Sequence, residues 1–181
     1  MNALLIVDLQ NDFLPGGALP APEGDRIIPV INGIMDEYDL VIASRDWHPG
    51  DSNHFERWPP HCIRNTEGAS YPEGFDKEKI GMELLKGTSN EDDGYSAFEA
   101  TNADLDEYLK KNGVSQLFLA GLTTEYCVKS TALDAVKNGY ETTVIADATA
   151  GVKENPGDEA QAYREMHEAG VRILRLSQES A

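Results

Sequence analysis

A cysteine at the expected start of a helix is the first candidate for chemistry in this 181-residue chain. The apolar run at 115–120 predicts a buried strand, and apolar residues recur at helical spacing after Thr124. Thr124 is therefore the predicted N-cap, which places Cys127 in the first helical turn. Free backbone N–H groups and the helix dipole favour a thiolate there, and the same N–H groups could hold an oxyanion. Cys127 is a candidate nucleophile, although a small buried hydrophobic side chain would fit the same position.

A cysteine nucleophile needs a proton acceptor, and Asp8 is the candidate that we favour. Asp8 ends the apolar run at 3–7, where burial would raise its affinity for protons. Lys86 ends the short apolar run at 82–85, and its positive charge would favour the ionised form of the Asp8–Cys127 pair. The alternatives are an Asp8 that caps a loop and a Lys86 that is merely solvated. Together the three residues predict a catalytic group.

Three of the four histidines fall within residues 48–61. Asp46 and His48 are two residues apart, so an extended chain points both side chains the same way. One aspartate with two or three histidines suits a divalent transition metal, and we expect zinc, with iron or manganese as alternatives. The sequence leaves open which of His54 and His61 binds, and a polar loop with incidental histidines is the competing interpretation. Such a metal would orient a substrate or polarise a water molecule.

Aromatic residues accompany these groups. Phe13 and Trp58 could clamp a flat ring by stacking, and Tyr95 is a third candidate, although each could belong to the core. His167, in the last predicted helix, is expected on the surface. The acidic run at 91–93 is expected to form a solvated turn.

Strand-like runs that alternate with helical patterns must position these residues. Strands are predicted at 3–7, 40–43, 82–85, 116–120, 142–146 and 171–176, and helices at 25–38, 103–112, 125–138 and 158–169. We expect Asn102 to cap the second helix. This order predicts an α/β fold with a mostly parallel sheet of about six strands and helices on both faces. Ligands of such sheets bind beyond the carboxyl ends of the strands, and the candidate residues fall there. The long polar segment at 47–75 is expected to be functional.

Composition excludes several classes of partner. Acidic residues outnumber basic ones by 32 to 15, which gives a formal charge of −17. Such a surface repels phosphate, so neither nucleic acid nor an anionic membrane is an expected partner. Two cysteines, no signal-peptide pattern and no membrane-length apolar run favour a single cytoplasmic domain over 1–181. Whether it forms a homo-oligomer stays open.

The chain resembles the isochorismatase-like family of cysteine hydrolases, and the nicotinamidases within it. The similarity spans nearly the whole chain, in the motifs VDLQNDF at 7–13, PGG at 15–17, SRDWHP at 44–49, WPPHC at 58–62, KGT at 86–88, YSAF at 95–98 and GLTTEYCV at 121–128. The resemblance implies the same α/β fold. Two departures are Glu125, where the family usually has aspartate, and the acidic segment at 89–94.

The resemblance also implies roles for particular residues. It implies that Asp8, Lys86 and Cys127 form a catalytic triad. It implies that Asp46, His48 and His61 hold a metal, with His54 as a further ligand in some members. It implies that the amides of Thr123 and Cys127 form an oxyanion hole and that Phe13 and Trp58 clamp the ring of the substrate. A cis peptide bond between Leu122 and Thr123 is expected with it.

The implied activity is hydrolysis of nicotinamide to nicotinate and ammonia in NAD salvage, with pyrazinamide-like carboxamides also accepted. The alternative within the family is another amidase, such as one acting on a carbamoyl compound. An isochorismatase proper does not use the cysteine nucleophile. From other classes, a metal-dependent oxygenase built on Asp46, His48 and His61, or a non-catalytic metal-binding or redox-sensing domain, would fit some of the same residues.

Overall fold

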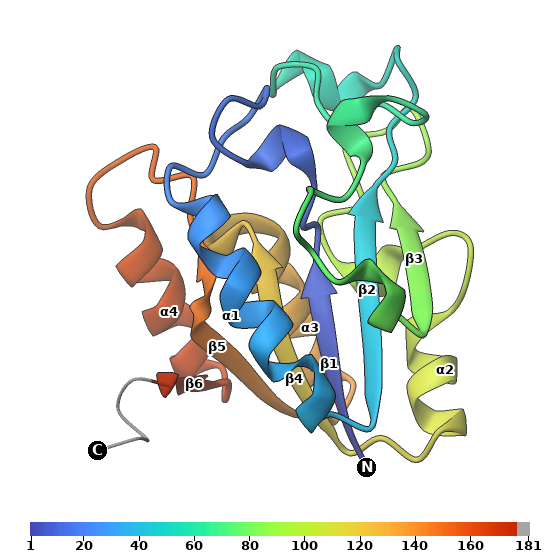
Figure 1. Cartoon of the computed structure of the whole chain (residues 1–181), viewed down its shortest axis with the longest axis vertical. Helices are drawn as coiled ribbons and strands as arrows, with labels where there is room; N and C mark the ends of the chain where they lie inside the picture. The colour runs from blue at the N-terminus through green and yellow to red at the C-terminus, as the bar shows by residue number, and fades with distance from the viewer. Residues whose placement is uncertain (177–181) are drawn as a thin grey trace.

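A parallel sheet forms the centre of the molecule, as Figure 1 shows for the computed structural model of the chain, which describes residues 1–176. In this part of the chain six strands lie in the order β3-β2-β1-β4-β5-β6, and every neighbouring pair is parallel. They are β1 (Asn2–Val7), β2 (Leu40–Asp46), β3 (Met82–Lys86), β4 (Gln116–Leu122), β5 (Glu141–Ala150) and β6 (Arg172–Leu174). The predicted fold class is confirmed. The last five residues of the predicted domain, 177–181, lie outside the described residues.

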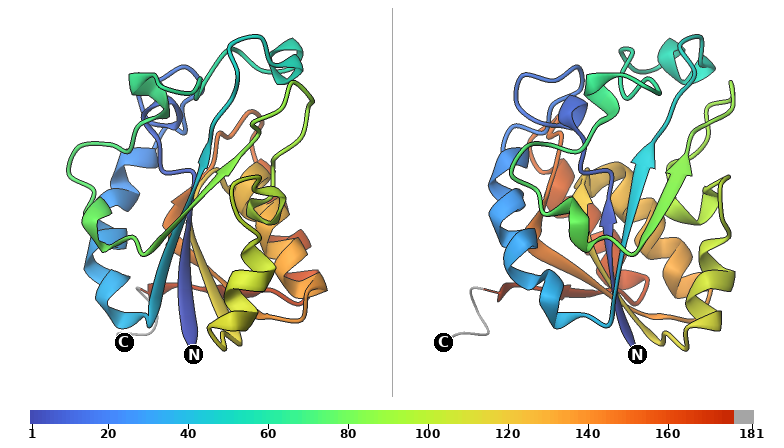
Figure 2. Two further views of the ribbon diagram at one scale, coloured as in Figure 1. Left: turned by 90° about the vertical axis from the view of Figure 1, so that its right-hand side faces the viewer. Right: turned by 45° about the vertical axis from the view of Figure 1, so that its right-hand side comes forward.

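Helices cover both faces of the sheet, as the edge-on view in Figure 2 shows. They are α1 (Ile27–Ile34), α2 (Leu105–Lys111), α3 (Lys129–Lys137) and α4 (Asp158–Glu168). The buried side chains of α1 pack with Leu4 and Ile6 of β1 on one face. Those of α2, α3 and α4 pack with Leu5 and Val7 on the other. Residues 3–7 are completely buried because β1 is covered on both faces, which is why this strand is a continuous apolar run.

The strand order changes direction between β1 and β4. The chain builds β2 and β3 on one side of β1, then crosses to place β4 and β5 on the other side. Parallel sheets bind ligands beyond the carboxyl ends of the strands at such a reversal. The segment between β2 and β3 passes over this end with 3₁₀ turns at Asn53–Glu56 and Glu67–Ala69, and then descends in green through a turn at Lys77–Lys79 to the start of β3 (Figure 1). The fold therefore prepares one edge of the sheet for a site.

Several predicted element ends are wrong, including those of the first helix, α1, and of α2, β5 and β6. Helix α2 is capped by Asp104, whose carboxylate accepts from the Glu107 amide at 3.0 Å. Asn102 instead bonds to β3, accepting from the Leu85 amide at 2.8 Å. Strand β5 continues past Asp147 to Ala150, because residues 149–150 still pair with β4. Strand β6 is shorter than predicted, since it is a partly exposed edge strand that pairs with β5 over residues 172–174 alone.

Among the described residues, no helix is both long enough and apolar enough to cross a bilayer.

Candidate active site

The amine of Lys86 lies at the centre of the site. Lys86 is the last residue of β3, and its side chain is completely buried. Nζ lies 2.7 Å from Asp8 Oδ2, 2.6 Å from Asp46 Oδ1 and 3.3 Å from Cys127 Sγ. Burial acts to lower the pKa of Lys86, but the two carboxylates outweigh it and hold the pKa above its ordinary value. The amine is therefore a permanent positive charge between two acids and a thiol.

Asp8 directly follows β1 and is completely buried. Its backbone adopts a φ of 47°, and its Oδ1 accepts a hydrogen bond from Ser44 Oγ at 2.9 Å. Burial is the main cause that raises the pKa of Asp8 to about 6; Asp46 adds to the rise, and Lys86 opposes it. A carboxylate with such a pKa is suited to accept a proton near neutral pH.

Cys127 lies in a π-helical turn, Thr124–Val128, that leads into α3. The predicted N-cap is wrong: Thr123 precedes the turn, while Thr124 Oγ1 donates to Glu159 Oε2 at 2.9 Å. Burial opposes the local preference for a thiolate. Burial raises the pKa of the Cys127 thiol well above its ordinary value, and the Lys86 charge only partly offsets this effect. A raised pKa favours the protonated thiol, so a nearby proton acceptor is needed to form the thiolate.

A carboxylate is close enough to accept that proton. Ligand-capable atoms of Asp8, Asp46 and Cys127 all lie within 4.8 Å of one another. The structure therefore brings together the acid, amine and thiol that β1, β3 and the segment after β4 supply. The convergence follows from parallel pairing, because β1 lies between β2 and β4 and β3 pairs with β2.

The Leu122–Thr123 peptide bond is cis, as expected. Thr123 is buried, and both Thr123 and Cys127 line the pocket described below. An oxyanion hole formed by their two amides stays a prediction.

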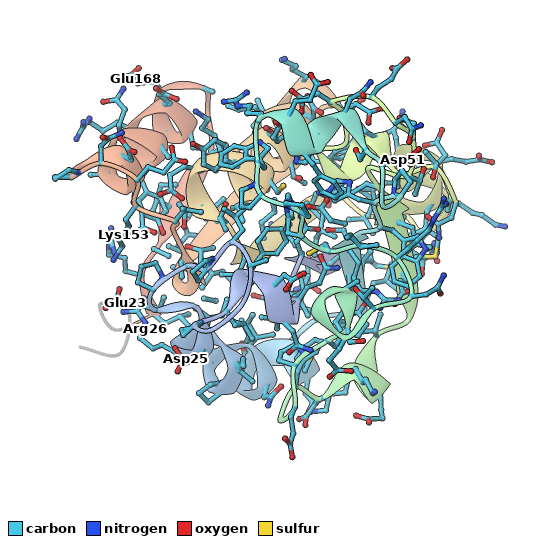
Figure 3. All side chains as sticks on the ribbon, turned by 90° about the horizontal axis from the view of Figure 1, so that it is seen from above. Glu23, Asp25, Arg26, Asp51, Lys153 and Glu168 are labelled. Atoms are coloured by element: carbon cyan, nitrogen blue, oxygen red, sulfur yellow. The ribbon has the colours of Figure 1, made fainter. Side chains whose placement is uncertain are left out.

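Glu125 ties the cysteine turn to the loop that follows β5. Its carboxylate accepts from the backbone amides of Val152 at 3.0 Å and Lys153 at 2.8 Å. Lys153 in turn donates to Glu23 at 2.9 Å, and Figure 3 shows this pair beside Arg26 at one side of the molecule. Glu125, at the position where the family usually has aspartate, therefore binds the backbone of this loop.

Three histidines gather beside the acid–amine–thiol group. Ligand-capable atoms of His48, His54 and His61 lie within 4.8 Å of one another. Asp46 Oδ2 lies 3.5 Å from His48 Nε2 and 3.9 Å from His61 Nε2. Both His54 and His61 belong to the cluster, and their roles as metal ligands stay predictions. His167 is exposed on α4, as expected.

Each of the three imidazoles is oriented through Nδ1. The partners of Nδ1 are Gly87 O at 2.8 Å for His48, Asp92 Oδ1 at 2.6 Å for His54 and Pro59 O at 2.7 Å for His61. Since these oxygens only accept, each Nδ1 carries a proton, and Nε2 of a neutral ring keeps a lone pair. Burial is the main cause that lowers the pKa of His54 and His61, which favours neutral imidazoles.

Asp46 and the three histidines offer the donor types that a divalent transition metal takes. Among the described residues, His48 Nε2 is buried without a hydrogen-bond partner, as an atom reserved for a metal would be. Metal–nitrogen bonds of about 2.0–2.1 Å place tetrahedral ligand atoms about 3.4 Å apart, close to the Asp46–His48 separation of 3.5 Å. Nitrogen and carboxylate donors suit zinc, iron or manganese.

A pocket opens between the histidines and the thiol. The residues that line it are Phe13, Leu19, Asp46, His54, Trp58, His61, Gly94, Tyr95, Thr123, Tyr126, Cys127 and Val152. Phe13, Trp58 and Tyr95, the three predicted aromatic residues, thus line the same pocket. Trp58 Nε1 donates to Tyr95 OH at 3.1 Å. Tyr126, whose ring centroid lies 4.9 Å from that of Trp58, was missed by sequence reasoning, although it stands next to Cys127.

Asp92 corrects another prediction. Rather than belonging to a merely solvated turn, its carboxylate accepts from His54 Nδ1 and, at 2.9 Å, from Tyr95 OH. No spacing rule could have found this contact, because 38 residues separate Asp92 from His54.

Comparisons with known proteins identify similar sequences and structures. The sequence model of the isochorismatase domain matches residues 2–178. A nicotinamidase of Escherichia coli (strain K12) is 38% identical, over 97% of this chain and 95% of the relative. The pyrazinamidase of Pyrococcus horikoshii, crystallised in complex with zinc, is 41% identical with a TM-score of 0.85, over 97% of this chain and 99% of that one.

A third similar protein was crystallised with a small molecule. PnC1 from L. infantum, in complex with nicotinate, is 33% identical with a TM-score of 0.90, over 98% of this chain and 93% of that one. The family expected from the motifs is confirmed by matches that span nearly the whole chain. This chain belongs to the isochorismatase family.

Proposed function

We propose that this chain hydrolyses nicotinamide to nicotinate and ammonia, and that it accepts pyrazinamide-like carboxamides as well. The observation that carries the proposal is the contact of Cys127 Sγ with Lys86 Nζ at 3.3 Å, with the Asp8 carboxylate 2.7 Å from the same amine. The similar proteins named as nicotinamidase and pyrazinamidase support it. Release of nicotinate would place the reaction in NAD salvage.

The reaction begins with proton transfer from the Cys127 thiol to the Asp8 carboxylate. The thiolate then attacks the amide carbon, and the carbonyl electrons move to oxygen, where the amides of Thr123 and Cys127 donate to the oxyanion. As the carbon–nitrogen bond breaks, Asp8 returns the proton to the departing ammonia. Lys86 keeps its proton throughout and stabilises the negative charge, whether Asp8 or Cys127 carries it.

The thioester is then cleaved by water. Asp8, again a carboxylate, takes a proton from the water molecule, whose oxygen attacks the thioester carbon. Collapse of this intermediate releases the carboxylic acid product and a thiolate, which recovers its proton from Asp8. Phe13 and Trp58 hold the pyridine ring between them, and Tyr95 supports the indole of Trp58 through the bond to Nε1.

Asp46, His48, His54 and His61 are proposed to hold one zinc ion per chain, and the zinc-bound pyrazinamidase supports this choice. When bound, the metal supplies a positive charge that orients the ring nitrogen or polarises a water molecule. Iron and manganese suit the same donors and stay alternatives.

Ammonia release from nicotinamide tests the proposal. Wild-type protein is expected to release ammonia and nicotinate in equal amounts. Cys127→Ala is expected to abolish turnover while metal content stays unchanged. Cys62→Ala, which removes the other free thiol, is the matched control and should keep most of the activity.

The same assay separates the rival functions. Appreciable activity in Cys127→Ala would end the cysteine mechanism. Absence of ammonia with the wild type, together with cleavage of a carbamoyl substrate, would favour the other amidase. Oxygen consumption that survives loss of Cys127 would favour an oxygenase, and absence of any turnover would favour a metal-binding or redox-sensing domain.

A further inference from the structure

The carboxylate of Asp92 joins the histidine cluster to the aromatic wall of the pocket. Its Oδ1 accepts from His54 Nδ1 at 2.6 Å and from Tyr95 OH at 2.9 Å. Tyr95 OH in turn accepts from Trp58 Nε1 at 3.1 Å. One oxygen atom thus connects a candidate metal ligand with two residues that line the pocket.

His54 differs from the other two histidines in how it is oriented. His48 and His61 donate to the backbone carbonyls of Gly87 and Pro59, which are part of the fold itself. His54 depends on a side chain, and that side chain belongs to the loop between β3 and the 3₁₀ turn at Ala97–Glu99. A substitution at one loop position can therefore remove what orients His54, while the other two imidazoles stay in place.

The exposure of the pair fits an orienting role. The His54 side chain is 6% exposed, whereas that of Asp92 is 42% exposed. A carboxylate that accepts from Nδ1 fixes the tautomer and ring orientation of a histidine ligand and makes Nε2 a stronger donor to a metal. The charge thus remains partly hydrated while its effect reaches a buried imidazole.

We propose that Asp92 is a positioning residue that fixes His54 as a metal ligand and, through Tyr95, holds Trp58 against the pocket. Metal affinity and ring binding are then coupled through one carboxylate. The metal half of this inference needs only a metal at the histidine cluster, and the ring half rests on the proposed hydrolysis of nicotinamide.

Zinc titration of the metal-free protein against a chromophoric chelator tests the metal half. Asp92→Ala is expected to weaken zinc binding by about 10–100-fold. Asp92→Asn should lose less, because the amide oxygen still accepts from Nδ1. Glu91→Gln removes an equivalent charge from an exposed neighbour and should bind zinc as the wild type does. Thermal unfolding of each metal-free variant checks that the loss is not general destabilisation.

Steady-state kinetics at saturating zinc test the ring half. Tyr95→Phe removes the hydroxyl but leaves the His54–Asp92 bond, so zinc affinity should stay within about twofold of the wild type while KM for nicotinamide rises. Asp92→Ala should raise KM by a similar factor at full metal occupancy, with a smaller change in kcat.

Two results would overturn the inference: wild-type zinc affinity in Asp92→Ala, or an equal loss of affinity in Glu91→Gln. An unchanged KM in Tyr95→Phe would overturn the coupling to the ring. If the wild type fails to hydrolyse nicotinamide but Asp92→Ala still loses zinc, the proposed function fails and the positioning role stands.

Discussion

Lys86 and Asp46 form a buried ion pair in which Nζ lies 2.6 Å from Oδ1. The other oxygen of the same carboxylate, Oδ2, faces His48 at 3.5 Å and His61 at 3.9 Å. Burial acts to raise the pKa of Asp46, but the Lys86 charge and His48 outweigh it and hold that pKa well below its usual range. Asp46 therefore links the acid–amine–thiol group to the histidine cluster.

Because Asp46 serves both groups, Asp46→Asn should damage both. The variant loses a charged metal donor and leaves Lys86 with one carboxylate partner fewer. We expect zinc affinity to fall by at least about 100-fold, with activity low even when zinc is supplied in excess. Asp51→Asn, at an exposed position labelled in Figure 3, is the matched control. Full activity of Asp46→Asn at saturating zinc would show that the link has no catalytic role.

The activity should rise with pH through the titration of Asp8. Only the carboxylate form accepts the Cys127 proton, and the pKa of Asp8 is raised to about 6, chiefly by burial. Below pH 6 the acid form dominates, so kcat/KM should fall by about tenfold per pH unit, whereas above pH 6 it should level off. Initial rates from pH 4.5 to 8 check this limb. A profile that is flat between pH 5 and pH 7 would contradict Asp8 as the base.

Removal of the metal should lower both activity and stability. A ligand that binds the folded chain alone stabilises it by about 2.7 kcal/mol when present at 100 times its Kd. Chelator-treated protein should therefore melt at a lower temperature than protein reloaded with zinc, and activity should return with the metal. Equal Tm values with and without zinc would speak against a site at His48, His54 and His61.

Gly121→Ala should strongly destabilise the fold, because of where a Cβ would lie. Gly121 has a φ of 112°, and a Cβ there would approach Val7 O to 2.0 Å in the neighbouring central strand. Gly139 has a φ of 89° with nothing within 4 Å of a Cβ, so Gly139→Ala isolates the cost of the backbone conformation, about 1–2 kcal/mol. Denaturant unfolding should show a clearly larger loss for Gly121→Ala, and equal losses would contradict the steric argument.

Much of the fold and the position of the site followed from local patterns. The central strands at 3–7 and 116–120 are covered on both faces of the sheet. Such strands are mostly apolar along their length, so they are easy to recognise in the sequence. Asp8, Asp46 and Lys86 stand at or just past the carboxyl ends of strands, and parallel pairing brings those ends to one edge. The convergence of Asp8, Lys86 and Cys127 beside the histidines could therefore be predicted before any distance was known.

The tertiary structure decided what depends on contacts between distant segments. Thr124 binds Glu159 instead of capping the turn, and Asp92 orients His54 across 38 residues. The pKa of the Cys127 thiol is high because the whole domain buries it, although its local position favours a thiolate. Local sequence specifies which side chains reach the edge of the sheet, whereas burial and long-range hydrogen bonds set their charge and orientation.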